Sequence, residues 1–244
     1  MFDNSLVDVG NNNYLKANFP HNGVDLPNKK ATGRFGNGKN AADFLVNYYS
    51  QVYENIRLEL GSNDSMVSNL KQQFERIHSF GARKFVVVET RLVGFCPAQR
   101  ASNERQCNED ANSMSVHYND SLKSMLQQLK AGLHVNYTFF KTYSVITDHS
   151  KRSFFRYSSY FPTLQVFPAC YVIRLKSKGF TETEAACCGI GKLNALAACL
   201  PVSSLCSNRR DYVFWDRFHP TEATHGSLVD TFRWSFQNTH SQRM

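Results

Sequence analysis

Apolar positions along the chain follow two different spacings, and the two alternate. Steps of three and four residues, typical of a helix with one buried face, occur over 41–53, 67–77, 109–131 and 221–236. Short apolar runs rich in β-branched and aromatic residues predict strands at 56–60, 84–88 and 135–140. The run Lys84–Val88 is expected to be a strand buried in a parallel sheet. Helices that alternate with strands predict an α/β fold, in which helices are layered on a parallel sheet.

One segment, residues 151–178, breaks this alternation. It holds seven aromatic residues, six cations and two prolines but no acid, and neither spacing persists in it. We interpret it as an insertion foreign to the fold, with a membrane-binding surface loop as the alternative. The rest of 1–244 is interpreted as a single domain, and the polar residues 238–244 as a disordered tail.

The charge and hydropathy of the chain argue against two classes of function. The net charge is +8, but 151–178 contributes +6 of it, so the cations do not form the broad basic face that a nucleic acid requires. No run of 18 apolar residues occurs, so no stable membrane insertion is expected. The first residues contain neither a basic segment nor an apolar core, so no signal peptide is recognisable.

Seven cysteines nevertheless indicate an oxidising, secretory compartment. Six lie in well-patterned regions and are expected to pair evenly: Cys96, Cys107, Cys187, Cys188, Cys199 and Cys206. The last four, set among glycines, predict an excursion stapled by disulfides. No C-x-x-C pair occurs, so a zinc site is not expected. Glycosylation sequons at Asn119 and Asn136 agree with secretion.

The stretch 211–225 contains the first candidate chemistry. Asp216 and His219 lie three residues apart, just before Pro220, which favours the first position of a helix. On such a loop the carboxylate can accept the proton of one imidazole nitrogen and leave the other nitrogen free to deprotonate a hydroxyl. Taken alone, the motif favours a simpler interpretation, in which Asp216 caps the helix and His219 is an unrelated loop residue. His225 is interpreted as lying on the helix surface.

Other stretches provide a candidate nucleophile and a series of sequence blocks in a defined order along the chain. Ser5 stands in the turn-rich run 4–13, and it is followed by glycine-containing blocks at 32–39, 61–64, 81–85 and 186–189, and then by 214–222. These blocks read NSLVDVGNNN, TGRFGNGK, GSND, GARKF, ACCG and FWDRFHPTE. In this order they closely resemble the plant GDSL esterase/lipase family of SGNH hydrolases, and the resemblance covers nearly everything outside 151–178.

The resemblance implies a three-layer α/β/α fold with a mainly parallel sheet and a hydrolase that cleaves acyl or lipid esters through an acyl-serine intermediate. It assigns Ser5 as nucleophile, His219 as general base and Asp216 as the residue that orients the base. It places the N–H of Ser5 and the side chain of Asn63 in the oxyanion hole, where losing one donor costs about 10²–10³ in rate. It implies no cofactor, no metal and an extracellular location. Neither the resemblance nor the residues give an oligomeric state.

Three departures from the family pattern bear on activity. Asp3-Asn4 stands where the family has glycine and aspartate before the serine, and the strand that precedes the serine is expected to be missing. The family's Ala-Ser-Gly-Gly-like loop before Gly61 has no counterpart, and a further gap follows Asp64. The alternatives to an active hydrolase are a catalytically inactive relative that at most binds acyl or glycan ligands, and a defective fragment.

Overall fold

A computed structural model describes residues 19–30, 33–46, 63–140 and 179–241. The first part contains α1 (Ala41–Val46), α2 (Asn63–Ser79), β1 (Lys84–Val88), the 3₁₀ helix η2 (Val93–Phe95), α3 (Pro97–Ala101), α4 (Glu109–Leu133) and β2 (Asn136–Phe140). The second part contains β3 (Glu182–Ala186), β4 (Cys188–Gly189), η4 (Lys192–Asn194), β5 (Ser204–Leu205), η5 (Arg209–Asp211), β6 (Tyr212–Phe214) and α8 (Glu222–Ser241). The strand predicted at 56–60 and the segment 151–178 lie outside the described residues, so both stay predictions.

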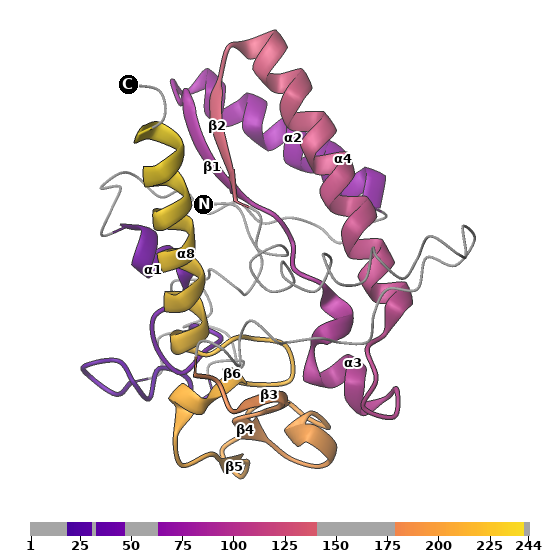
Figure 1. Ribbon diagram of the computed structural model, residues 1–244, viewed down its shortest axis with the longest axis vertical. Coiled ribbons are helices and arrows are strands. Elements are labelled where there is room, and N and C mark those ends of the chain that lie inside the picture. The colour runs from indigo at the N-terminus through magenta and orange to yellow at the C-terminus, as the bar shows by residue number, and fades with distance from the viewer. Residues whose placement is uncertain (1–18, 31–32, 47–62, 141–178, 242–244) are drawn as a thin grey trace.

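Parallel strands interspersed with helices confirm the α/β fold. β1 pairs with β2 in parallel, from Lys84 opposite Asn136 to Val88 opposite Phe140. β3 and β6 form a second parallel pair, and β4 and β5 form a short antiparallel one. Within the described ranges these pairs are not joined into one sheet. Figure 1 shows β1, β2, α2 and α4 in the upper part of the molecule and β3 to β6 in the lower part, with α8 rising from the lower part.

α2 and α4 pack on β1 and β2 and form what we call the helical layer, residues 63–90 and 109–140. Its core is apolar and is made of Val67, Leu70, Phe74, Val87, Leu122, Met125, Leu126, Leu129 and Val135. α4 begins where Asn108 accepts a hydrogen bond from the N–H of Ala111 (3.1 Å), which satisfies one N–H of the first turn. The helices predicted at 67–77 and 109–131 are therefore confirmed.

The prediction that β1 is a buried strand was wrong for one of its faces. Val87 is 7% exposed, but Val86 and Val88 are 42% and 40% exposed. Successive side chains of a strand point to opposite faces of the sheet. Among the described residues, the helices of the layer therefore cover the face that carries Val87 and not the face that carries Val86 and Val88.

Residues 187–206 form the predicted stapled excursion. Disulfides join Cys187 to Cys206 and Cys188 to Cys199, and these sulfurs pack against the buried ring of Trp215. The expectation that six cysteines pair evenly was wrong. Cys107 is disulfide-bonded, but Cys96 is a buried free thiol that packs as a small apolar group against Phe180, Val213 and Phe214.

Two further expectations are corrected. Asn119 is buried: its Oδ1 accepts the N–H of Thr90 (2.8 Å) and its Nδ2 donates to the carbonyl of Thr90 (2.7 Å), so its side chain fastens α4 to the end of β1 and is not accessible for glycosylation. α8 runs to Ser241, beyond the predicted end at 236, because no glycine or proline follows Gly226. None of the helices in the described ranges is long and apolar enough to span a bilayer.

Candidate active site

The loop between β6 and α8 folds back on itself and brings Asp216 and His219 together. The N–H of Trp215 donates to the carbonyl of His219 (2.7 Å), and Phe214 forms an isolated antiparallel bridge with Pro220. α8 begins at Glu222, two residues after the proline, and Thr221 is its cap: the hydroxyl of Thr221 accepts the N–H of Thr224 (3.2 Å). Asp216 is therefore not the helix cap of the simpler interpretation.

The carboxylate of Asp216 is directed at the imidazole of His219. Nδ1 of His219 lies 2.8 Å from both Oδ1 and Oδ2 of Asp216. Oδ1 also accepts the backbone N–H groups of Phe218 and His219, each at 2.8 Å. The loop thus holds the carboxylate with its own backbone N–H groups. Because Asp216 and His219 are only three residues apart, all of these hydrogen bonds form within the loop.

Both side chains are buried, with 4% of Asp216 and 7% of His219 exposed. Burial by itself would raise the pKa of the Asp216 carboxyl. The charge and hydrogen bond of His219 and the two backbone donors outweigh burial and lower that pKa below its ordinary value. An ionised Asp216 accepts the proton on Nδ1, which fixes the tautomer in which Nε2 can take a proton.

The ring of Phe35 covers one face of His219. The two rings are stacked, with centroids 5.0 Å apart and planes 21° from parallel. Phe35 belongs to the glycine-rich block 32–39, and two residues of this block, Asn37 and Gly38, lie against the start of α8. Asn37 fixes this contact: its Oδ1 accepts the N–H of Glu222 (2.9 Å), and its Nδ2 donates to Asp25 (2.7 Å). A side chain at Gly38 would collide with Glu222, since an added Cβ would lie 2.1 Å from Oε2.

Arg91 and Cys96 also contact the loop that carries Asp216 and His219. The guanidinium of Arg91 donates to the carbonyl of Phe218 and lies over the ring of Phe214, 5.8 Å from its centroid. The thiol of Cys96 lies 3.8 Å from the same carbonyl, and burial raises the pKa of this thiol. The carbonyl of Phe218, the residue just before His219, is thus contacted by two side chains from the segment after β1.

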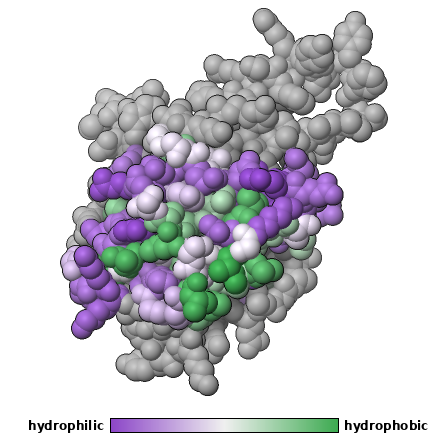
Figure 2. Space-filling model, turned by 90° about the horizontal axis from the view of Figure 1, so that it is seen from below, coloured by the Kyte–Doolittle hydropathy of each residue, from purple (hydrophilic) through white to green (hydrophobic). Residues whose placement is uncertain are grey.

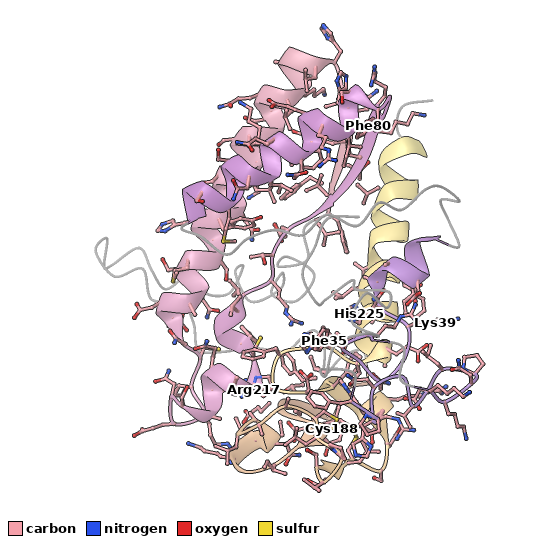
Figure 3. The ribbon with its side chains drawn as sticks, turned by 180° about the vertical axis from the view of Figure 1, so that it is seen from behind. Phe35, Lys39, Phe80, Cys188, Arg217 and His225 are labelled. Atoms are coloured by element: carbon pink, nitrogen blue, oxygen red, sulfur yellow. A yellow bond between two sulfur atoms is a disulfide. The ribbon has the colours of Figure 1, made fainter. Side chains whose placement is uncertain are left out.

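His225, interpreted from sequence as a surface residue, is buried in the first turns of α8. It is 6% exposed, and its Nδ1 has no hydrogen-bond partner among the residues that the structure describes. Burial, followed by the charges of Arg91 and His219, lowers its pKa to about 3. Figure 3 shows His225 near the start of α8, at about the level of Phe35. The surface interpretation was wrong because the buried face at the start of α8 is formed by polar residues, among them Thr221, Thr224 and His225, so the apolar pattern does not reveal it.

The remaining predicted site residues are only partly placed. Ser5 lies outside the described residues. Asn63 is the first residue of α2, and its side chain is not among those described. Sequence reasoning missed Phe35, Arg91 and His225, because their contacts with the 216–219 loop join segments far apart in the chain or depend on which face of α8 is buried.

Comparison with known proteins gives a consistent family. The sequence model of the GDSL-like lipase/acylhydrolase family matches residues 58–232. One GDSL esterase/lipase of Arabidopsis thaliana is 33% identical over 336 aligned residues, which cover 94% of this chain and 84% of the relative. A second is 26% identical over 339 residues, covering 94% and 85%. A third is 33% identical over 199 residues, covering 79% and 49%.

The first two alignments are longer than this chain, which agrees with a chain that lacks part of the family sequence. An alignment of 336 residues is longer than the 244 residues present, so the first relative has internal residues that this chain lacks. The family match spans both parts of the described structure, including the loop with Asp216 and His219. The chain belongs to the GDSL esterase/lipase family of carboxylic ester hydrolases.

Proposed function

We propose that this chain is a serine ester hydrolase in which Asp216 and His219 activate Ser5. The observation that carries the proposal is the buried pair: Asp216 bonded to Nδ1 of His219 at 2.8 Å, with the carboxylate held by two backbone N–H groups. A hydroxyl is a poor nucleophile until a base removes its proton, and this pair is built to supply the base.

The reaction follows from these roles. Nε2 of His219 takes the proton of the Ser5 hydroxyl as Oγ bonds to the acyl carbon of the ester, and the resulting imidazolium is stabilised by Asp216. When the tetrahedral adduct collapses, the bond to the alcohol oxygen breaks and His219 returns the proton to that oxygen. Water, deprotonated by His219, then hydrolyses the acyl-serine by the same steps. The N–H of Ser5 and the side chain of Asn63 are proposed as donors to the oxyanion.

The environment of the pair suits this chemistry. Phe35 shields one face of the imidazole, and the burial of both partners strengthens their electrostatic interaction. A pKa of Asp216 below its ordinary value keeps the orienting carboxylate charged throughout the neutral range. We propose acyl or lipid esters as substrates and a secreted location, which the two disulfides of the excursion support.

The test compares hydrolysis of p-nitrophenyl butyrate by the wild type, Ser5→Ala and Ser207→Ala. Ser207 is an exposed serine of the second part and provides a matched control. The proposal expects Ser5→Ala to lose at least about 10³-fold in kcat/KM and Ser207→Ala to be unchanged. Equal rates for Ser5→Ala and the wild type would favour the alternative that the protein is a catalytically inactive relative. A wild type without a cooperative thermal transition would indicate a defective fragment.

A further inference from the structure

We infer that the stapled excursion forms a peripheral docking surface for an anionic lipid–water interface. The inference deepens the proposed function, because it places the surface of a substrate aggregate beside His219. The surface, hereafter the docking face, consists of Lys192, Leu196, Val202, Leu205, Arg210, Arg217 and Phe218.

The apolar members of the docking face are unusually open to solvent. Leu196 is 72% exposed and Val202 is 83% exposed, and Leu205 and Phe218 are each 38% exposed. Figure 2, which looks at the molecule from below, shows apolar residues gathered over the middle of this end with hydrophilic residues around them. Exposed apolar residues that are grouped and rimmed by polar ones mark interaction sites, whereas scattered single ones do not.

The backbone beneath these side chains is fixed. The two disulfides, the pairing of β4 with β5 and the bond from the N–H of Leu196 to the carbonyl of Ile190 (3.0 Å) hold the loop from within. The loop therefore cannot fold its leucine and valine inward, and their exposure is a property of the folded state.

The charge of residues 185–210, which include the excursion and the residues beside it, selects the partner. Residues 185–210 contain no Asp or Glu, and they carry Lys192, Arg209 and Arg210. Arg209 is paired with Asp25 (2.6 Å), whereas Lys192 and Arg210 are exposed cations. Apolar residues flanked by cations match a surface with acyl chains beneath anionic headgroups.

The docking face continues into the catalytic loop. The guanidinium of Arg217 donates to the carbonyl of Leu196 (3.4 Å) and lies over the ring of Phe218, 4.9 Å from its centroid. Phe218 directly precedes His219. A lipid surface seated on the excursion would therefore meet the loop that carries the general base.

The test is co-sedimentation with vesicles of phosphatidylcholine, alone or mixed with phosphatidylglycerol, carried out in the Ser5→Ala background so that no lipid is hydrolysed. Binding to the mixed vesicles is expected, with much weaker binding to phosphatidylcholine alone and at high salt. The double change Leu196→Ser/Val202→Ser is expected to weaken binding about tenfold. Reversing Lys192 or Arg210 to Glu is expected to cost about fivefold each.

Phe80→Ser is the matched control. Phe80 is 68% exposed and lies at the opposite end of the molecule from Cys188 (Figure 3), so its loss should leave vesicle binding unchanged. Equal binding by all variants, no binding by any, or equal binding to neutral and anionic vesicles would overturn the inference. So would a concentration-dependent dimer that Leu196→Ser/Val202→Ser abolishes without vesicle binding, because the face would then cover a second copy.

The two proposals can fail separately. With Ser5 restored, the docking variants are expected to hydrolyse soluble p-nitrophenyl butyrate at the wild-type rate. Vesicle binding by a chain with no soluble esterase activity would remove the proposed function and keep the docking face. Full activity on soluble p-nitrophenyl butyrate without vesicle binding would keep the proposed function and remove the docking face.

Discussion

The helical layer is held together by different interactions from those of the site region, by which we mean residues 19–30, 33–40 and 179–231. In the layer, leucine, valine and phenylalanine side chains from α2 and α4 close over Val87. In the site region, buried polar groups form hydrogen bonds: Nε1 of Trp215 donates to the side-chain Oδ1 of Asn22 (3.0 Å), and the hydroxyls of Thr221 and Thr224 donate to the backbone carbonyls of Tyr212 and Val213. Apolar packing is therefore the main feature of the first region, whereas the catalytic loop of the second is also fixed by directed hydrogen bonds.

This difference explains where reactivity can be built. Apolar packing tolerates small shifts, because dispersion and burial depend weakly on angle. A base must lie within a few tenths of an ångström of its partner, and hydrogen bonds with defined geometry provide that precision. The carboxylate of Asp216, with three N–H groups directed at Oδ1, is the clearest case in this chain.

The largest effect is expected from Asp216→Asn. The amide can donate to Nδ1 and so favour the wrong tautomer of His219, and kcat should fall by about 10³–10⁴-fold with little loss of fold. Hydrolysis of p-nitrophenyl butyrate measures it, with a thermal melt alongside. Asp120→Asn, a change at a surface ion pair of α4, is the matched control and should keep the wild-type rate. A small loss at Asp216 would make its carboxylate a structural group.

Part of this architecture follows from sequence, and the reason is locality. α2, β1, α4 and β2 were predicted because their apolar spacing reflects contacts within a single element. The pair of Asp216 and His219 was a candidate because only three residues separate them, and the family resemblance assigned its roles. The stack of Phe35 on His219 and the bond from Arg91 to Phe218 were not predicted, since they join segments more than a hundred residues apart. The burial of His225 depends on how α8 packs, which its own pattern does not show.

The helical layer should respond to Leu126→Ala in stability and not in chemistry. Leu126 is 1% exposed, and truncating a fully buried leucine costs about 2–5 kcal/mol of the free energy of unfolding. Urea denaturation measures the loss, and kcat per folded molecule should not change. Met114→Ala, at a 59% exposed position of the same helix, should cost less than about 0.5 kcal/mol. A selective loss of kcat in Leu126→Ala would show that the two regions are coupled.

His225 is expected to make the stability of the site region sensitive to acid. With a pKa of about 3 when folded and 6.5 when unfolded, the unfolded chain binds more protons between these values. The stability that depends on a neutral His225 is therefore fully present above pH 6.5 and is lost as pH falls toward 3. At pH 4.5 the loss of unfolding free energy is about 2–3 kcal/mol.

Replacing His225 with Asn should remove this slope. The difference in unfolding free energy between pH 7 and pH 4.5, measured by urea denaturation, should shrink by about 2 kcal/mol relative to the wild type. His117→Asn, at an exposed histidine of α4, should leave the slope intact. An unchanged slope in the His225 variant would assign the acid sensitivity to other groups.

The smallest effect is expected from Phe35→Leu, which keeps an apolar side chain but removes the ring stacked on His219. Aromatic pairs contribute about 0.5–1.5 kcal/mol beyond their burial, so kcat/KM should fall about two- to tenfold. Phe80→Leu, at an exposed phenylalanine of the other end, should have no effect. An unchanged rate in Phe35→Leu would mean that the hydrogen bonds of the loop orient the imidazole without the stack.

The most direct measurement of the central claim is the site of labelling by a fluorophosphonate, which reacts only with a serine whose proton a base can remove. An adduct is expected on the peptide that contains Ser5, found by mass spectrometry in the wild type and in Ser207→Ala. The adduct should be absent from Ser5→Ala and from His219→Ala. A folded wild type that takes no label, or takes it on another serine, would contradict the claim that Asp216 and His219 serve Ser5.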